Sequence, residues 1–368
     1  MKTNRVLSSS IVTSLLLALC NFPATSASLG GFTSSLRPLI ATLIIGRPPV
    51  DSQQQSKFIK EYDEIWELIQ NNFLYRNRLH NWSRWRHKFD DQLVSPQAMQ
   101  IAVDTMLGSL NDPYTFYRNA NATSQRNQED VETNVVDYRM VDQNIGYIRL
   151  KTFCSKNCVG EMRNALQQLK GAKAIVMDLR DNKGGSIEDA FRIFSMFVKS
   201  GRFTSMRGVD QKNIVQERLT VGKTKLLNRR GGSVSFQSRE RNISKSRPLL
   251  ILVDGRTKSA AEMLAGALRD SAGAKLIGTK TYGKGVIQRV WEFDNNTSIK
   301  VTSAAFLLPS GATIHGVGIK PAIKVSSGKS DRQLQLARRL LRANQASLVS
   351  FKSLGARPNN QIIAKDRI

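Results

Sequence analysis

A serine at the start of a predicted helix is the strongest candidate for chemistry in this sequence. Residues 249–253 are apolar and predict a buried strand, which the turn residues Asp254 and Gly255 follow. From Ser259 onward, apolar side chains recur at helical spacing. The first N–H groups of a helix have no partner within it, so they can stabilise the oxyanion that forms when a serine attacks a carbonyl carbon. This pattern predicts that Ser259 is a nucleophile with an oxyanion site beside it.

The base that would deprotonate this serine is less obvious. The chain has three histidines, His80, His87 and His315, and none lies near Ser259 in the sequence. A Ser-His-Asp triad is therefore disfavoured, although His315 stays open as a base. A lysine can serve instead when burial lowers its pKa, because the neutral amine then accepts the serine proton. Lys284 lies between two glycines in a predicted turn, but a single lysine is more often a solvated surface charge.

The spacing of these residues, with the segments KSAAEMLAGAL and GTKTYGKGVIQ around them, resembles the carboxy-terminal processing peptidases, also called tail-specific proteases. The resemblance implies that Ser259 is the nucleophile, Lys284 the general base and Gln288 the residue that orients the lysine. It also implies that the backbone N–H groups of Gly185 and Ala260 form the oxyanion hole. The implied activity is that of a serine endopeptidase which cleaves near protein C-termini through an acyl-enzyme. It needs no cofactor and no metal.

Further segments extend the resemblance over residues 58–325, and two departures from the family pattern accompany them. The matching segments are LGSLNDPYT (107–115), IGYIRLKTF (145–153), DLRDNKGG (178–185) and GATIHGVGIKPAIKV (311–325). Lys183 stands where many relatives have proline or glycine, and Lys258 and Ala261 flank the serine where small hydroxyl residues are usual. Neither departure removes a side chain that does chemistry. Lys258 adds a positive charge near the nucleophile, which can lower the pKa of Lys284 further or alter substrate preference.

Three more residues are implied by the resemblance to support the site and the end of its helix: Glu262, Asp270 and Thr281. Glu262 and Asp270 share roughly the helix face of Ser259. Asp270 would lie about 16 Å along the helix from the serine, at ~1.5 Å per residue, which is too far for contact. No third triad member is therefore expected there.

The composition of the chain indicates which kinds of partner it can bind. The chain of 368 residues has a formal net charge of +26 and a pI near 10.4, yet its basic residues are scattered and no nucleic-acid-binding signature is present. We expect no nucleic acid partner. A basic surface that is attracted to an anionic membrane surface is the simpler interpretation. The other expected partners are protein substrates with accessible C-terminal tails.

The N-terminus predicts export. Residues 1–27 combine Lys2 and Arg5 with an apolar stretch and then small residues, which is typical of a secretory signal peptide cleaved after Ala27. The expected location is the bacterial periplasm or the thylakoid lumen, and the signal alone favours neither. Residues 28–56 are predicted to be a linker.

Removal of the signal peptide would leave two cysteines, Cys154 and Cys158. In an oxidising compartment this pair can close a small disulfide. Two free thiols without a function are an equal alternative. The spacing excludes a CxxC redox or zinc motif.

The remaining pattern predicts three regions after the linker. Residues 57–134 are predicted to form a small helical module and a connection, with helices over 58–73, around Trp82, Trp85 and Phe89, and from Pro96. Residues 135–325 alternate strands and helices, which predicts an α/β protease core with a mixed sheet. The resemblance implies the crotonase-like ββα spiral fold for this core. Residues 201–247 are predicted to be a hairpin or surface insertion, and residues 326–368 a basic C-terminal tail.

Most relatives carry a peptide-binding PDZ module after the DPYT segment. The connection from Tyr117 to Ile145 is polar and shorter than the ~40 residues that a domain needs without metals or disulfides. We therefore expect no PDZ domain. This favours, as an alternative function, a non-catalytic tail-binding or scaffold protein on the same fold. The presence of Ser259, Lys284 and Gln288 together favours the enzyme.

Overall fold

A computed structural model describes residues 51–121, 134–155, 157–221, 226–227, 233–234, 242–326 and 330–345. The predicted signal peptide, most of the predicted linker and the end of the basic tail lie outside these ranges. Within them, no helix combines the length and the apolar character needed to cross a membrane. From Ser56 onward the chain forms one compact unit.

The core of this unit is a six-stranded sheet in the order β13-β10-β9-β4-β3-β2. Its strands are β2 (Val136–Asp142), β3 (Ile145–Leu150), β4 (Ala174–Asp178), β9 (Leu249–Val253), β10 (Lys275–Gly278) and β13 (Ile323–Lys324). All neighbours run parallel except β2, which is antiparallel to β3. The predicted α/β fold with a mixed sheet is therefore confirmed.

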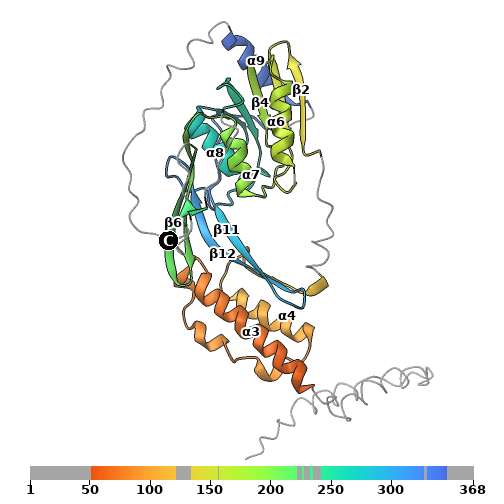
Figure 1. Cartoon of the computed structure of the whole chain (residues 1–368), viewed down its shortest axis with the longest axis vertical. Coiled ribbons are helices and arrows are strands. Elements are labelled where there is room, and N and C mark those ends of the chain that lie inside the picture. Colours follow the sequence, from red (N-terminus) through yellow and green to blue (C-terminus); the bar gives the residue numbers. More distant parts are fainter. Residues whose placement is uncertain are drawn as a thin grey trace, which may run out of the picture. The chain divides into compact units, whose positions relative to one another are not determined.

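Helices cover both faces of this sheet (Figure 1). The helices α6 (Cys158–Gln168), α7 (Ile187–Ser195) and α8 (Ala260–Ala272) pack on one face, where Met177 and Ile251 belong to the largest apolar cluster. The helix α9 (Arg332–Gln345) packs on the other face, and its Leu334 lies in a cluster with Val176 and Leu250. Burial on both faces explains why β4 and β9 are almost continuously apolar. Part of the predicted basic tail is thus a helix that completes the core.

A second, antiparallel sheet of five strands adjoins the core. Its strands are β1 (Phe116–Arg118), β5 (Gly201–Asp210), β6 (Asn213–Val221), β11 (Val286–Glu292) and β12 (Ser298–Leu307). The strand β12 pairs with β11 along one edge, and with β1 and β5 along the other. The strands β5 and β6 form a hairpin whose turn residues Gln211 and Lys212 both have positive φ. The hairpin predicted after residue 201 is therefore confirmed, but it belongs to a sheet. A short pair, β7 (Leu226–Leu227) and β8 (Ser233–Val234), follows.

The helical module before the core packs on this second sheet. It contains α3 (Ser52–Asn72) and α4 (Pro96–Gly108), with Ser95 capping α4, and three short 3-10 turns: η1 (Arg76–Arg78), η2 (Trp82–Trp85) and η3 (Asp90–Gln92). Ile299 and Val301 of β12 are buried among its apolar side chains. Figure 1 shows α3 and α4 beside the end of the β11–β12 hairpin.

The helix predicted around Trp82, Trp85 and Phe89 is wrong. Only the 3-10 turn η2 forms there, after Asn81 in a left-handed conformation. Both tryptophans are buried, and their carbonyl groups accept hydrogen bonds from side chains of α3. Tertiary packing therefore replaces a regular helix at this point.

The connection between β1 and β2 includes residues 122–133, which lie outside the described ranges. The strand β2 at its end was not predicted from the sequence. The absence of a PDZ module stays a prediction.

Candidate active site

The turn between β9 and α8 holds Ser259 in a strained conformation. Its φ of 58° and ψ of −121° are unusual for a residue with a side chain; such a conformation costs about 1–3 kcal/mol and persists only where its surroundings hold it in place. The surroundings do so here. Asp254 Oδ1 accepts the N–H of Thr257 at 2.9 Å, and Thr257 Oγ1 donates to the carbonyl of Leu179 at 2.9 Å. The predicted strand, turn, serine and helix are thus present, with Ser259 at the N-cap of α8.

The glycine pair of the DLRDNKGG segment lies directly beside this turn. A Cβ atom added to Gly184 would lie 2.9 Å from Cβ of Ser259 and 3.0 Å from the nitrogen of Ala260. Gly184 and Gly185 have φ of +90° and +142°, which favour glycine. No larger residue would therefore let these two segments approach so closely.

The side chain of Asn182 fixes this glycine pair. It is fully buried, its Oδ1 accepts the N–H of Gly184 at 2.9 Å, and its Nδ2 donates to the carbonyl of Leu150 at 2.9 Å. Asn182 was not among the residues predicted from the sequence to have a role. Its position in the sequence, close to the glycine pair, could have indicated that it supports that pair.

Two backbone N–H groups at this junction have no acceptor among the described residues: those of Gly185 and Ala260. The N–H of Gly184 is used by Asn182, and its carbonyl accepts the N–H of Phe153 at 3.0 Å. The two predicted oxyanion donors thus lie on the two segments that meet at Ser259, and no described protein group accepts either N–H. Unpaired donors beside a nucleophile can stabilise a tetrahedral oxyanion.

One buried carboxylate links the serine turn to the lysine turn. Oε2 of Glu262 accepts the N–H groups of Ser259 at 3.0 Å and Lys284 at 2.9 Å. Oε1 of Glu262 accepts the N–H of Gly283 at 2.7 Å and the hydroxyl of Thr281 at 2.5 Å. Glu262 is fully buried, so these four donors take the place of water around its charge. Glu262 and Thr281 therefore lie at the site as supporting residues.

The environment of Lys284 lowers its pKa to about 8. Burial is the largest cause, the positive charges of Lys300 and Lys258 add to it, and the negative charge of Asp112 opposes it. The ammonium nitrogen lies 5.1 Å from the centre of the Tyr114 ring. With this pKa about a tenth of the molecules carry a neutral amine at pH 7, and more do so at higher pH.

The side chains of the predicted catalytic residues are not hydrogen-bonded to one another in the described part of this structure. No hydrogen bond joins the side chains of Ser259, Lys284 and Gln288 in the described part of the chain. Gln288 follows a bulge in β11, and its Nε2 is buried without a partner. The hydroxyl of Thr302, opposite Gln288 on β12, also has none. The structure brings the lysine turn to the serine turn but does not show Gln288 holding the lysine.

An aromatic cluster that the sequence analysis did not anticipate surrounds the lysine. The ring of His315 stacks on Tyr75 with centroids 6.5 Å apart, and lies 5.9 Å from the ring of Tyr114. Burial lowers the pKa of His315, and its Nδ1 has no partner. His315 makes no hydrogen bond to Ser259 within the described ranges, so it lines the lysine side of the site. The two segments that supply Tyr114 and His315 were part of the family resemblance.

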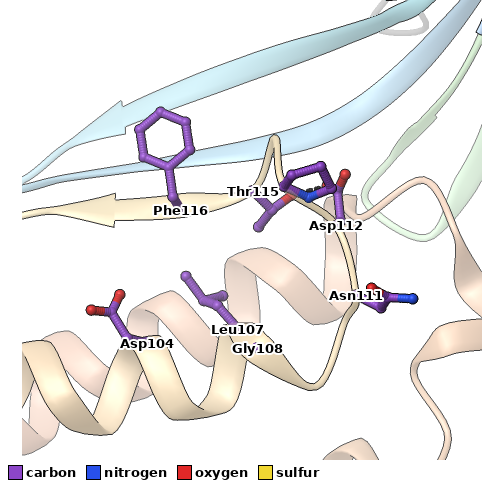
Figure 2. A pocket seen from close by; sticks show the side chains of 8 residues that line it. Asp104, Leu107, Gly108, Asn111, Asp112, Thr115 and Phe116 are labelled. Carbon is purple, nitrogen blue, oxygen red and sulfur yellow. Dashed lines mark hydrogen bonds between the residues drawn. The ribbon is translucent and has the colours of Figure 1, made fainter. Parts of the chain in front are cut away.

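The DPYT turn positions Tyr114. The hydroxyl of Thr115 donates to Oδ2 of Asp112 at 2.6 Å, and the N–H of Tyr114 approaches Oδ1 of Asp112 at 3.4 Å. Figure 2 shows this turn above α4, at a depression of about 420 Å³. The depression is lined by Asp104, Leu107, Gly108, Asn111, Asp112, Pro113, Thr115 and Phe116. None of these residues belongs to the serine or lysine turn, although Asp112 and the neighbouring Tyr114 lie near Lys284.

The last predicted supporting residue lies at the other end of α8. Asp270 pairs with Nε of Arg269 at 2.7 Å and accepts the N–H of Ser310 at 3.1 Å. It therefore ties the end of the helix to a neighbouring turn and does not reach Ser259. Within the described ranges, no three His, Cys, Asp or Glu side chains are grouped to hold a metal ion.

The expected disulfide is not formed. Cys154 and Cys158 are both free; Cys154 is exposed and Cys158 is buried. The first turn of α6 directs Cys158 into the core, where burial, with a contribution from Asp189, raises the pKa of its thiol to about 12. Sγ of Cys154 instead lies 3.8 Å from the carbonyl oxygen of Gly184. The two side chains therefore point to different surroundings.

Comparison with known proteins agrees with this geometry. The chain is 29% identical over 249 residues to a carboxy-terminal-processing protease of Bartonella bacilliformis, which covers 65% of this chain and 52% of that protein. It is 35% identical over 208 residues to the carboxy-terminal processing protease CtpA of Bacillus subtilis, covering 56% and 40% of the two chains. It is 37% identical over 181 residues to a carboxyl-terminal-processing protease of Synechocystis, covering 49% and 37%. The chain thus spans about half or less of the length of these relatives.

Two solved structures resemble the fold. A photosystem II D1 C-terminal processing protease has a TM-score of 0.59 at 18% identity, covering 74% of this chain and 93% of that one. A lipoprotein from Streptococcus agalactiae has a TM-score of 0.60 at 16% identity, covering 81% and 98%. Residues 144–325, which contain the serine turn, the lysine turn and the glycine pair, match the model of peptidase family S41. Over these residues the chain therefore matches peptidase family S41, in agreement with its similarity to the carboxy-terminal-processing proteases above.

Proposed function

We propose that the protein is a serine endopeptidase that cleaves other proteins near their C-termini with a Ser-Lys dyad. The observation that carries the proposal is the junction of three segments. Ser259 is held in a strained turn, two unpaired N–H groups lie beside it, and a lysine with a lowered pKa lies on the adjoining turn. Glu262 holds the two turns together. These are the parts that acyl transfer by a serine requires.

The proposed reaction has two stages. The neutral amine of Lys284 accepts the hydroxyl proton of Ser259 while the serine oxygen attacks the scissile carbonyl carbon. The N–H groups of Gly185 and Ala260 stabilise the oxyanion. As the intermediate collapses, the C–N bond breaks, and the ammonium of Lys284 protonates the departing amine. A water molecule, deprotonated by the same lysine, then hydrolyses the ester and releases the second fragment.

Gln288 is proposed to orient Lys284 when substrate is bound. Its buried Nε2 has no partner in the structure, and a buried amide without a partner is costly. When the side chain turns, its Oε1 can accept an N–H of Lys284 and direct the lysine toward Ser259, because the amide oxygen accepts while Nε2 only donates. Hydrogen bonds of catalytic groups often tighten only when substrate is present.

The substrates are proposed to be proteins with accessible C-terminal tails, and the protein is proposed to act after export, in the periplasm or the thylakoid lumen. Similarity to carboxy-terminal processing proteases and the secretory pattern of residues 1–27 support this proposal. The net charge of +26 supports attraction to acidic tails or to an anionic membrane surface.

A fluorophosphonate probe tests the nucleophile, because it reacts with activated serines. The wild-type protein should be labelled once and should cleave an unstructured peptide with an apolar C-terminus. Ser259→Ala should abolish both, with unchanged circular dichroism. Ser310→Ala, at an exposed serine near the far end of α8, is the matched control and should retain both. Labelling that survives in Ser259→Ala would refute the assignment.

No hydrogen bond joins the side chains of Ser259 and Lys284 in the described part of the chain, and this observation favours a second candidate function. In it, the protein binds C-terminal tails without catalysis. This second function predicts that tail peptides bind while the wild-type protein is neither labelled nor able to cleave them. The same assay therefore separates the two functions.

A further inference from the structure

The residue before the nucleophile is a lysine whose backbone is fixed at the reaction centre. The N–H of Lys258 donates to the carbonyl of Asn182 at 2.9 Å. A Cβ atom on Gly184 would lie 2.7 Å from the carbonyl oxygen of Lys258. Lys258 therefore lies in the junction between the glycine pair and Ser259, and its side chain starts within one residue of the attacking oxygen.

The side chain of Lys258 extends over an exposed aromatic ring. Its Nζ lies 4.0 Å from the centre of the Tyr282 ring, and half of the Tyr282 surface is exposed. The N–H of Tyr282 donates to the carbonyl of Thr257 at 3.0 Å. Lys258 and Tyr282 are thus neighbouring side chains at the surface, between the serine turn and the turn of Lys284.

Lys258 has no acidic partner in the described part of the chain. Some other cations do have one: Arg180, for example, lies 2.7 Å from Asp331, and Arg289 lies 2.8 Å from Asp210. Among the described residues, no carboxylate lies within 4.0 Å of the Lys258 ammonium. Its charge instead adds to that of Lys284, whose pKa it helps to lower. An excess of positive charge at the open side of a reaction centre attracts an anion.

We propose that Lys258 is a specificity-determining residue that binds a carboxylate of the substrate next to the scissile bond. This inference rests on the proposed peptidase function. The carboxylate has two sources in a protein tail: the terminal α-carboxylate and an aspartate or glutamate side chain. The flat face of Tyr282 holds the ammonium from one side and leaves its other N–H donors free for this anion.

Binding to the Ser259→Ala protein tests this inference without turnover. Three fluorescent peptides share one apolar tail: one ends in a free carboxylate, one in a carboxamide, and one in a carboxamide with a glutamate at the penultimate position. Fluorescence polarisation should show that at least one carboxylate-bearing peptide binds about tenfold more tightly than the neutral peptide, as expected for a charge-assisted hydrogen bond. Which peptide gains identifies the source of the carboxylate.

Matched variants attribute this preference to Lys258. Lys258→Gln should reduce the tenfold difference to about twofold or less, and Lys258→Arg should retain most of it because the charge is kept. Lys280→Gln removes an exposed lysine from the loop that follows β10 and should leave the preference intact. Equal affinity for the acidic and neutral peptides, a preference that survives Lys258→Gln, or no binding of any peptide would each overturn the proposal. Fluorophosphonate labelling of the wild-type protein reports separately on the peptidase function.

Discussion

Ser259 and Lys284 are joined through their backbones, because their N–H groups donate to the same oxygen, Oε2 of Glu262, at 3.0 and 2.9 Å. The carboxylate therefore sets the distance between the proposed nucleophile and the proposed base. Glu262→Gln removes its charge and leaves at least one of these donors without an acceptor. We expect a loss of about 3 kcal/mol in the free energy of unfolding. We also expect acylation to slow by at least about tenfold, since both turns can then shift.

Thermal unfolding and the rate of fluorophosphonate labelling measure these two effects. Glu64→Gln is the control, because Glu64 is exposed on α3 and pairs only with Lys60, 3.9 Å away. Loss of the Glu64–Lys60 pair should lower the free energy of unfolding by less than about 0.5 kcal/mol. Equal stability and labelling in the two variants would show that Glu262 does not set the geometry.

The pH dependence of acylation reports the state of Lys284. Its pKa of about 8 lies below the ordinary value of a lysine, and only the neutral amine accepts a proton. The labelling rate should therefore rise with pH and level off above about 8 to 9. Lys284→Arg should be inactive, since a guanidinium group stays charged. A rate that is independent of pH between 6 and 10, or an active arginine variant, would remove Lys284 from the mechanism.

The same lysine destabilises the folded protein at neutral pH. Because folding lowers its pKa from 10.5 to about 8, the folded state disfavours the charged form. The full penalty applies below pH 8, and it vanishes as pH rises toward 10.5. Lys284→Met should therefore raise the melting temperature at pH 7, and the gain should shrink between pH 8 and 10.5. A gain that does not change with pH would indicate better packing as its cause.

Local patterns predicted much of this fold. The apolar runs of β4 and β9 and the helical spacing after Ser259 were sufficient for the elements that position the site. The sequence pattern gave wrong or missing predictions where tertiary contacts determine burial and strand formation. Ile101 of α4 is apolar but 67% exposed, which its residue type alone does not indicate. The strand β2 was missed because, at the edge of its sheet, it exposes Tyr138 and Met140 and lacks a regular alternation.

The site was predicted only in part for the same reason. Residue types and spacing identified Ser259 and Lys284, but the hydrogen bonds of Glu262 depend on how α8 meets the turn after β10. The parallel pairing of β9 and β10 brings these segments together. No local pattern contains that contact. The direction of the Cys158 thiol into the core is likewise a property of packing.

The two thiols should differ in reactivity. Cys154 is exposed, whereas the pKa of Cys158 is raised to about 12 and its side chain is buried. Without reduction, N-ethylmaleimide at pH 7.5 should modify Cys154 within minutes and Cys158 only after unfolding. Peptide mass spectrometry distinguishes the two sites. If neither thiol reacts until a reductant is added, the protein as purified contains the disulfide instead.

The proposed oxyanion hole includes the glycine pair, which Asn182 fixes from within the core. Its side chain accepts the N–H of Gly184 and donates to the carbonyl of Leu150, both at 2.9 Å. Asn182→Ala leaves these two buried groups unpaired, at a cost of about 1–3 kcal/mol each. It also frees the peptide of Gly185, whose N–H is the proposed donor to the oxyanion.

Loss of one oxyanion donor slows acyl transfer by about 10²–10³-fold, so labelling of Asn182→Ala should slow by this factor. The pH midpoint of labelling should stay near 8, because Asn182 is not among the groups that shift the pKa of Lys284. Asn213→Ala is the control, because Asn213 is exposed at the start of β6 and its side chain bonds to the carbonyl of Gln211 at 3.0 Å, and this variant should be labelled at the wild-type rate. A moved midpoint would mean that the substitution disturbs the lysine turn. An unchanged rate would mean that Gly185 is held by other contacts, and Asn182 would then be a structural residue alone.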